Sequence, residues 1–494
     1  MILYIDRHTF HFEMENICRL FLPLEKIRTL HIGAEADCPD EDAVFAYTGL
    51  ADGEAVCRLR LQDYDRTLRA PVQPPCAQEE NPAERLLAEL LYRLLCDAFG
   101  TESDWGILTG VRPVKLMRRL TRGHGEEEAA AYLREKLLVS PEKTRLCRET
   151  MHNEDAILAL SRPESFSLYV SVPFCPTRCD YCSFVSQTVE RAAALMEDYV
   201  QALVREIAAT GEWARRCGLR LETVYFGGGT PTTLSAAQLT QVLRAVEGAF
   251  DLSAVREYTV EAGRPDTVTA DKFAALRAAG VSRISINPQT LHDSVLQAIG
   301  RKHTVQQFYD AFDLARRCGM DNINTDLIAG LPTDTPEGFA ETLDNILALH
   351  PESVTVHTLS LKRAANLVIQ RRADAQTGND TRSMIARTVR LLPAAGYRPY
   401  YLYRQSRTVG NQENVGWAMP GREGLYNVYI MDESHTILAC GAGGVTKLKQ
   451  PGTEYLERIF NYKFPYEYIN GFAEMLARKE RIASFYAEKC GVTQ

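Results

Sequence analysis

Three cysteines within eight residues are the clearest chemical feature of this sequence. Cys175, Cys179 and Cys182 form a C-x3-C-x2-C arrangement that directly follows an expected strand over residues 167–172. Cysteine thiolates are the usual ligands of iron–sulfur clusters. Three thiolates at this spacing favour a cubane cluster whose fourth iron has no protein ligand and is free to bind a cofactor or substrate.

Two other interpretations of the triplet are weaker. A structural zinc site normally has a fourth Cys or His at short spacing, whereas the next candidates are Cys217 and His292. A disulfide would leave one of the three cysteines unpaired. Because Tyr181 precedes the last cysteine, the pattern is also more specific than an isolated C-x2-C pair.

Short apolar strands alternate with longer helices after residue 165. The strands are expected at residues 167–172, 223–226, 258–261, 283–287, 322–329 and 353–359. The helices between and after them are expected at about residues 190–217, 235–250, 270–279, 305–318, 336–349 and 382–394. Because each crossover packs back right-handedly on the sheet, six such units predict a parallel sheet with outer helices. The predicted fold class is α/β, a partial and open (βα)6 barrel over residues 165–400.

Polar residues lie where these expected strands end. A glycine run, Gly227-Gly-Gly-Thr-Pro, follows the second strand, and Glu261 ends the third. Gln289 follows the fourth strand, Asp326 lies in the exit of the fifth, and His357 lies in the sixth. Barrel enzymes place their chemistry beyond the carboxyl ends of the strands. A glycine run often only makes a turn, but after a strand its bare backbone can approach a ligand closely.

Four segments resemble the radical S-adenosylmethionine (SAM) family and, within it, the oxygen-independent coproporphyrinogen III oxidase group. They are Ser167-Leu-Tyr-Val-Ser-Val-Pro-Phe-Cys, Val224-Tyr-Phe-Gly-Gly-Gly-Thr-Pro-Thr, Asn324-Thr-Asp-Leu-Ile-Ala-Gly-Leu-Pro and His357-Thr-Leu-Ser-Leu-Lys-Arg. An N-terminal extension, Trp105-Gly-Ile-Leu-Thr-Gly-Val-Arg-Pro-Val-Lys and Asn414-Val-Gly-Trp resemble the HemZ-type coproporphyrinogen dehydrogenases. The resemblance is firm over residues 165–460. It implies a radical SAM barrel, a 4Fe-4S cluster on the three cysteines, and SAM on the open iron.

The resemblance places the methionine part of SAM beside the glycine run. Gly228, Gly229 and Thr230 would hold its amino group, and Tyr169 would lie next to it. Tyr181, between the second and third cysteines, would lie near the adenine. For Tyr169, an ordinary packed aromatic ring is the alternative.

The resemblance also assigns charged and amide side chains. Glu261 matches a carboxylate of the SAM pocket, with a simple strand-end charge as the alternative. Gln289 and Asp326 match the groups that bind the ribose hydroxyls, and Arg301 matches the cation that pairs with the SAM carboxylate. These pairings are chemically reasonable, because a carboxylate accepts hydrogen bonds from the two hydroxyls of a ribose and a guanidinium forms two parallel hydrogen bonds to a carboxylate.

The implied reaction is the oxidative decarboxylation of coproporphyrinogen III to protoporphyrinogen IX. In this reaction, reductive cleavage of SAM yields a 5'-deoxyadenosyl radical that removes a hydrogen from a propionate, and loss of carbon dioxide leaves a vinyl group. The cofactors carry the difficult chemistry. The expected partners are therefore a tetrapyrrole substrate and a reduced flavodoxin or ferredoxin-type electron donor.

A substrate with four propionates needs a cationic site. The candidates on or near the expected rim are Arg178, Lys302, His303, Lys362, Arg363 and Arg404. Lys362 and Arg363 rank first because they directly follow the sixth strand.

Two departures from the family pattern leave the substrate open. The decarboxylating members continue past the third cysteine with a Gly-Cys-Asn-type run that is implicated in placing a second SAM, whereas Ser183-Phe-Val-Ser follows here. The haem-chaperone branch carries a His-Asn-x-x-Tyr-Trp motif, whereas the corresponding stretch here is Tyr426-Asn-Val-Tyr-Ile-Met and lacks the haem-ligating His. Met419 and Tyr426 are expected to pack in the core, with ligation of a haem iron as the alternative. Haem trafficking and action on another tetrapyrrole remain the alternatives.

Three further segments surround the expected barrel. Residues 1–69 predict an α+β accessory domain with a half-buried strand at 54–62, and the alternation of His8, Phe10 and Phe12 predicts a strand without metal. A Pro-rich linker leads to a helical segment at 81–160 that begins with Asn81 and Pro82. Residues 401–494 predict a small C-terminal domain. Its loop from Gly410 to Gly424 is long enough for a lid in which Trp417 stacks on a macrocycle, or is a connector.

Composition limits the class of protein. A net charge of -8 argues against affinity for nucleic acid or an anionic membrane. No apolar stretch is long enough for a membrane span, and the N-terminus does not have the pattern of a signal peptide. Thirteen scattered cysteines do not form a disulfide framework. We therefore expect a monomeric, cytoplasmic enzyme.

Overall fold

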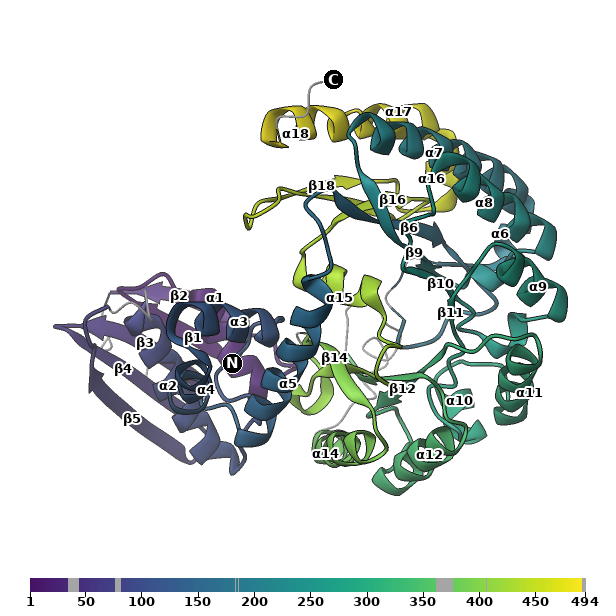
Figure 1. Ribbon diagram of the computed structural model, residues 1–494. Coiled ribbons are helices and arrows are strands. Elements are labelled where there is room, and N and C mark those ends of the chain that lie inside the picture. Colours follow the sequence, from purple (N-terminus) through teal and green to yellow (C-terminus); the bar gives the residue numbers. More distant parts are fainter. Residues whose placement is uncertain are drawn as a thin grey trace. The chain divides into compact units, whose positions relative to one another are not determined.

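The computed structural model describes residues 1–33, 44–75, 81–182, 184, 186–360, 376–405 and 407–490. The chain divides into two compact units, drawn in Figure 1. The first comprises Met1–Met151 and Leu402–Glu413, and the second comprises His152–Tyr401 and Asn414–Gln494. The helical segment is thus grouped with the N-terminal strands, and most of the C-terminal segment is grouped with the barrel.

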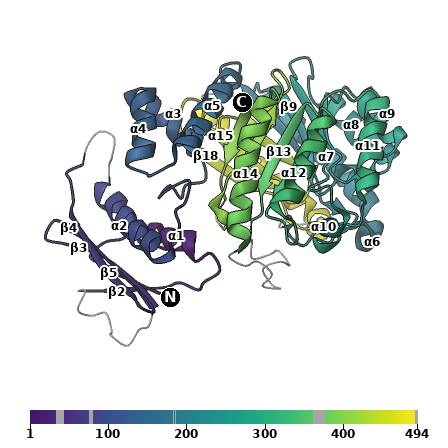
Figure 2. The same cartoon turned by 90° about the horizontal axis from the view of Figure 1, so that it is seen from below.

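The first unit contains a five-stranded sheet in the order β2-β1-β3-β4-β5. Its strands are β1 (Ile2–Asp6), β2 (Arg28–Ile32), β3 (Val44–Ala51), β4 (Glu54–Leu61) and β5 (Tyr64–Pro71). Helices α1 (His11–Phe21) and α2 (Pro82–Phe99) lie on one face of the sheet (Figure 2), where they bury its apolar side chains. The strand expected through His8, Phe10 and Phe12 is wrong because α1 begins at His11.

The remaining helices of this region lie within the predicted helical segment at residues 81–160. They are α3 (Pro113–His124), α4 (Glu126–Glu135) and α5 (Pro141–Leu158). Helix α2 has Pro82 in its first turn and ends at Gly100, whose φ of 64° is the left-handed conformation that glycine adopts most readily. Asn81 occupies the N-cap position, but its side chain makes no capping hydrogen bond.

The predicted partial barrel is confirmed in the second unit. Its parallel strands are β6 (Ser165–Val172), β9 (Arg220–Gly228), β10 (Glu257–Glu261), β11 (Arg283–Ser285), β12 (Ile323–Ala329) and β13 (Ser353–Thr358). Outer helices follow them as α7 (Met196–Arg216), α8 (Ala236–Ala249), α9 (Ala270–Ala278), α11 (Val305–Arg317), α12 (Pro336–Ala348) and α14 (Gln376–Ala394). The helices lie outside the curved sheet in Figure 1. Ser235 and Thr304 begin α8 and α11 with capping boxes, which satisfy otherwise unpaired backbone donors.

The C-terminal segment extends both edges of this sheet. Strands β14 (Arg398–Tyr403) and β15 (Asn414–Ala418) lie beyond β13, whereas β16 (Thr436–Cys440), β17 (Val445–Lys449) and β18 (Leu456–Phe460) lie beyond β6. The lid predicted between Gly410 and Gly424 is wrong, because Trp417 lies in β15 opposite Val354 and its side chain is fully buried. Helix α15 (Leu425–Asp432) connects the two edges.

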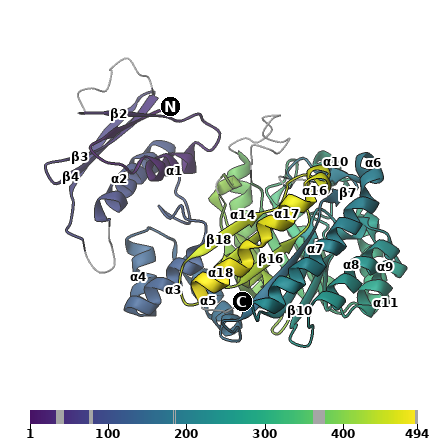
Figure 3. The ribbon, with the colours of Figure 1, turned by 90° about the horizontal axis from the view of Figure 1, so that it is seen from above.

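The last helices pack against α7. They are α16 (Pro465–Asn470), α17 (Phe472–Lys479) and α18 (Arg481–Cys490), and Figure 3 shows them beside α7. Among the described residues, no helix is both long and apolar enough to cross a membrane. Every cysteine in the same part of the chain is free.

A buried ion pair fixes α17 to α7. Lys479 Nζ lies 2.6 Å from Glu206 Oε1, and neither side chain is exposed to solvent. Glu206 also accepts hydrogen bonds from Asn461 Nδ2 at 2.7 Å and from the Gly441 amide at 2.6 Å. The carboxylate thus joins α7, the turn after β16 and the residue that follows β18.

Replacing Glu206 with Ala should destabilise the second unit strongly. The change leaves the Lys479 cation buried without its partner, which typically costs about 3–5 kcal/mol. The matched control is Glu212→Ala on the same helix, because Glu212 pairs with Arg215 at the surface and such pairs contribute about 0–1 kcal/mol. Urea unfolding followed by circular dichroism measures both variants, and equal midpoints for the two would contradict this role of Glu206.

Candidate functional site

The candidate site begins where β6 and β9 end. The cysteine loop, residues 175–182, follows the short strand β7 (Phe174–Cys175), which pairs with β8 (Gln187–Thr188). The glycine loop, residues 227–230, lies against the residues directly before the cysteine loop, because the Gly229 amide donates to Val172 O at 2.8 Å and the Thr230 amide to Phe174 O at 2.7 Å. A Cβ at Gly229 would stand 2.5 Å from Phe174 O, so only glycine permits this approach.

The three cysteines occupy one partly buried turn. Cys179 is buried, and the Cys182 amide donates to Cys179 O at 3.1 Å. Burial raises the pKa of Cys182 to about 11, with smaller contributions from Cys179 and Cys175 that show that the thiols are neighbours. Thr230 Oγ1 donates to Cys175 Sγ at 3.5 Å. Iron would favour the thiolate form, since metal binding displaces the thiol protons.

The turn does not form a closed metal cage. In the part of the chain that the structure describes, no three Cys, His, Asp or Glu side chains converge as a ready metal site. The donor set still fits an iron–sulfur cluster, because it offers three thiols on one turn. Two buried guanidinium groups, Arg264 and Arg301, lie next to Cys179 and can balance the negative charge of a thiolate-bound cluster.

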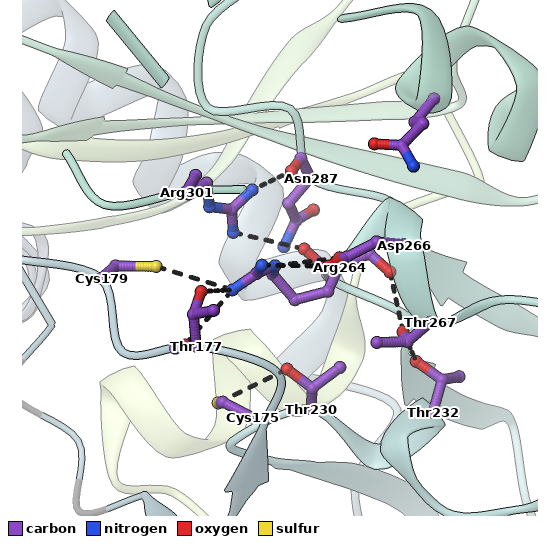
Figure 4. A network of polar contacts seen from close by, with 12 residues as sticks. Cys175, Thr177, Cys179, Thr230, Thr232, Arg264, Asp266, Thr267, Asn287 and Arg301 are labelled. Atoms are coloured by element: carbon purple, nitrogen blue, oxygen red, sulfur yellow. Dashed lines mark hydrogen bonds and ion pairs between the residues drawn. The ribbon is translucent and has the colours of Figure 1, made fainter. Parts of the chain in front are cut away.

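Arg264 is a site residue that the sequence did not identify. It follows β10, and Figure 4 shows it between the cysteine loop and Asp266. Its Nη1 donates to Thr177 Oγ1 at 3.0 Å and lies 4.0 Å from Cys179 Sγ, while Nε and Nη2 each donate to Asp266 at 3.2 Å. The only local hint in the sequence was the Arg264-Pro-Asp266 spacing, which is too common in loops to predict a functional site.

Arg301 approaches the cysteine loop from the segment after α10 (Asp293–Ala298). Its guanidinium donates to Asn287 O and, at 3.3 Å, to Gly263 O. Burial lowers the pKa of Arg301, but Tyr181 and Cys179 more than offset this and hold it above its usual value. The structure therefore places Arg301 beside Tyr181 and Cys179 of the cysteine loop, and its pairing with the SAM carboxylate stays a prediction.

Two carboxylates on neighbouring parts of the rim have different protonation behaviour. Asp326 accepts from Asn287 Nδ2 at 2.8 Å and from Asn324 Nδ2 at 2.7 Å, and His357 Nε2 lies 3.8 Å away. Burial raises the pKa of Asp326, but these partners, His357 first, lower it below its usual value. Burial raises the pKa of Glu261 to about 7, assisted by the charge of Asp326. At neutral pH one group is therefore ionised while the other titrates.

Gln289 is held in an uncommon backbone conformation beside Asp326. Its φ is 69°, its amide donates to Asp326 O at 3.0 Å, and its carbonyl accepts from Ile328 N at 3.1 Å. Left-handed conformations of non-glycine residues cluster at functional sites. These bonds place Gln289 alongside β12, next to the predicted ribose-binding carboxylate.

Three tyrosine rings stack on the inner side of the barrel. The Tyr225 and Tyr426 ring centroids are 4.4 Å apart, and Tyr169 lies 6.0 Å from Tyr426. Tyr225 also donates to Glu261 Oε1 at 2.6 Å. Tyr426 is buried, so the prediction that it packs in the core is confirmed.

The predicted substrate-binding cations do not form one group. Lys362 and Arg363 lie outside the described residues, as do Ser183 and Val185 after the cysteine loop. The prediction for Arg404 is wrong, because its buried guanidinium donates to Leu108 O and, at 3.2 Å, to Asn411 O within the first unit. The other three flank the site: Arg178 and Lys302 are exposed and His303 is buried.

Comparisons with known proteins agree with this geometry. The model of the radical SAM superfamily matches residues 169–346. The chain is 35% identical over 493 residues to the oxygen-independent coproporphyrinogen-III oxidase-like protein HemZ of Bacillus subtilis, covering 95% of this chain and 97% of that relative. It is 30% identical to the haem chaperone HemW of the same species, over 61% of this chain and 77% of that protein.

A solved structure shows the same fold. The coproporphyrinogen III oxidase HemN of Escherichia coli, described as a radical SAM enzyme, aligns with a TM-score of 0.51 and 22% identity. The alignment covers 65% of this chain and 72% of that one. The family match and the near full-length similarity to HemZ show where the chain belongs. It is a member of the radical SAM superfamily and of its family of oxygen-independent coproporphyrinogen-III oxidase-like proteins.

Proposed function

We propose that this protein is a radical SAM enzyme that holds a 4Fe-4S cluster on Cys175, Cys179 and Cys182 and acts on a propionate side chain of a tetrapyrrole. The observation that carries the proposal is that the glycine loop lies next to the start of the cysteine loop. The amides of Gly229 and Thr230 donate to Val172 O and Phe174 O, directly before Cys175, and Thr230 Oγ1 donates to Cys175 Sγ. A ligand bound to an iron on the cysteine loop would therefore lie close to the glycine loop.

The rim residues fit a zwitterionic nucleoside ligand. The glycine loop would accept the methionine amino group, Arg301 would pair with its carboxylate, and Asp326 with Gln289 would bind the ribose. When bound, the cluster and SAM supply a one-electron reduction and a hydrogen-abstracting radical. The chain's own contribution is orientation: Asn287 and Asn324 hold the Asp326 carboxylate in one position.

For the substrate we propose coproporphyrinogen III, converted to protoporphyrinogen IX with electrons from a flavodoxin or ferredoxin-type donor. The family name of the HemZ relative supports a porphyrinogen substrate. Arg178, in the cysteine loop, and Lys302, next to Arg301, are exposed and could meet propionates. Neither residue alone identifies the tetrapyrrole.

Haem trafficking is the second candidate, favoured by the 30% identity to a haem chaperone. One feature of the structure counts against it. Tyr426 occupies the position of the haem-ligating His, but it is buried and stacked on Tyr225 and Tyr169. Its hydroxyl would have to leave this stack to reach a haem iron.

Loss of any one cysteine of the triplet should abolish the cluster. Anaerobic reconstitution of the wild type is expected to give about four irons per chain and a reducible cubane spectrum. Cys175→Ala, Cys179→Ala and Cys182→Ala should each lose that spectrum, whereas Cys318→Ala, outside the loop, should keep it. Iron analysis and electron paramagnetic resonance measure the result. Stoichiometric zinc without iron in the wild type would refute the cluster.

Removing the Asp326 charge should weaken SAM binding without disturbing the cluster. A charge-assisted hydrogen bond contributes about 1.5–3 kcal/mol, so Asp326→Asn should raise the Kd for SAM by about ten- to hundredfold. Asp313→Asn on α11 is the matched control, because Asp313 lies in an exposed pair with Arg317. Calorimetry on reconstituted protein and the yield of 5'-deoxyadenosine test this. An unchanged Kd would show that the ribose lies elsewhere.

Incubation with SAM, dithionite and coproporphyrinogen III should release carbon dioxide and give vinyl products by mass spectrometry. If 5'-deoxyadenosine forms but no carbon dioxide is released, the proposed radical chemistry stands and coproporphyrinogen III is rejected as the substrate. Little SAM cleavage with tight haem binding would instead favour trafficking. In that case a Soret band that is lost in Tyr426→Phe would identify Tyr426 as the haem ligand.

A further inference from the structure

Arg264 links three segments of the rim that are far apart in the sequence. Its guanidinium donates to Thr177 O at 3.3 Å and to Thr177 Oγ1 at 3.0 Å in the cysteine loop. Its own carbonyl accepts from Thr267 Oγ1 at 2.7 Å. Thr267 in turn lies 2.6 Å from Thr232 Oγ1, in the turn after the glycine loop. Figure 4 shows this chain of contacts.

The Arg264 guanidinium is fixed in one orientation. Two of its nitrogens donate to the two oxygens of Asp266, and the Arg264 side chain is only 3% exposed. A bidentate guanidinium–carboxylate pair fixes geometry as well as charge. The third nitrogen is therefore directed at the cysteine loop, where it lies 4.0 Å from Cys179 Sγ.

A second observation indicates that an acceptor belongs in this region. The His303 side chain is buried, and neither ring nitrogen has a hydrogen-bond partner in the described part of the chain. Burial, with the charges of Arg301 and Arg264, lowers the pKa of His303 to about 3, so the ring is neutral and carries one N–H donor. A buried unpaired donor is costly unless a ligand satisfies it.

We infer that Arg264 is a positioning residue that fixes the cysteine loop and holds a positive charge at Cys179, thereby setting the reduction potential of the cluster. The inference rests on the proposed function, because it requires the cluster. Hydrogen bonding and charge around the sulfurs set such potentials. A cation near the cluster favours the reduced form, since reduction adds negative charge.

The test is a redox titration of the reconstituted protein, followed by electron paramagnetic resonance. Arg264→Gln should lower the equilibrium constant for reduction at least tenfold, which is about 59 mV for one electron. Arg264→Lys keeps the charge and should restore much of the potential. Arg387→Gln is the matched control, because Arg387 pairs with Asp344 at the surface, and its potential should equal that of the wild type.

A second measurement uses the iron-free protein and reports loop position alone. The rate of Cys179 alkylation, read by mass spectrometry against Cys318, should rise in Arg264→Gln and in Asp266→Asn. Asp266→Asn keeps the charge of Arg264 but removes the carboxylate that fixes its guanidinium. It therefore tests the same role if Arg264→Gln does not fold. A wild type that binds no iron would overturn the proposed function and this inference together. An intact cluster with unchanged potential and unchanged alkylation in these variants would overturn the inference alone.

Discussion

The close approach of two backbone segments is the constraint on which the rest of the site depends. Gly229 packs its amide against Val172 O, and a side chain there would collide with Phe174 O. Because Gly229 has no side chain, the exits of β6 and β9 approach closely enough for two backbone hydrogen bonds to join them. The cysteines then lie next to the glycine loop, and the carboxylates of β10 and β12 lie farther along the same rim.

Charge is distributed unevenly around this contact. Arg264 and Arg301 approach the cysteine loop, whereas Asp326 and Glu261 lie along the rim on β12 and β10. Positive groups would thus face the proposed anionic cluster, and acceptors would face the hydroxyls and ammonium of the proposed nucleoside ligand. Glu261 has a pKa of about 7 because it is buried and lies near Asp326. Its protonation state can therefore change when a charged ligand binds nearby.

The sequence predicted the barrel well because each strand–helix unit carries its own local signal. Strand edges and helix starts such as Ser235 and Thr304 were found within a few residues. It did not reveal Arg264, because the partners Thr177 and Cys179 lie 87 and 85 residues away. It also misjudged Trp417, since a Gly- and Asn-rich run resembles a loop until its pairing with β13 is known. Both failures have one cause: local sequence patterns carry no information about contacts between residues that are far apart in the chain.

The C-terminal segment, which lies outside the strand–helix repeats, supplies residues that pack against the barrel strands. One stretch of chain supplies β15 to one edge and β16 to the other, so α15 must cross between them. The start of α15 is fixed when the Leu425 amide donates to the buried Glu257 carboxylate at the base of β10. This bond places Tyr426 on Tyr225, which donates to Glu261. A residue distant in sequence therefore supports a carboxylate of the rim, and substitution at position 426 acts on the site through packing.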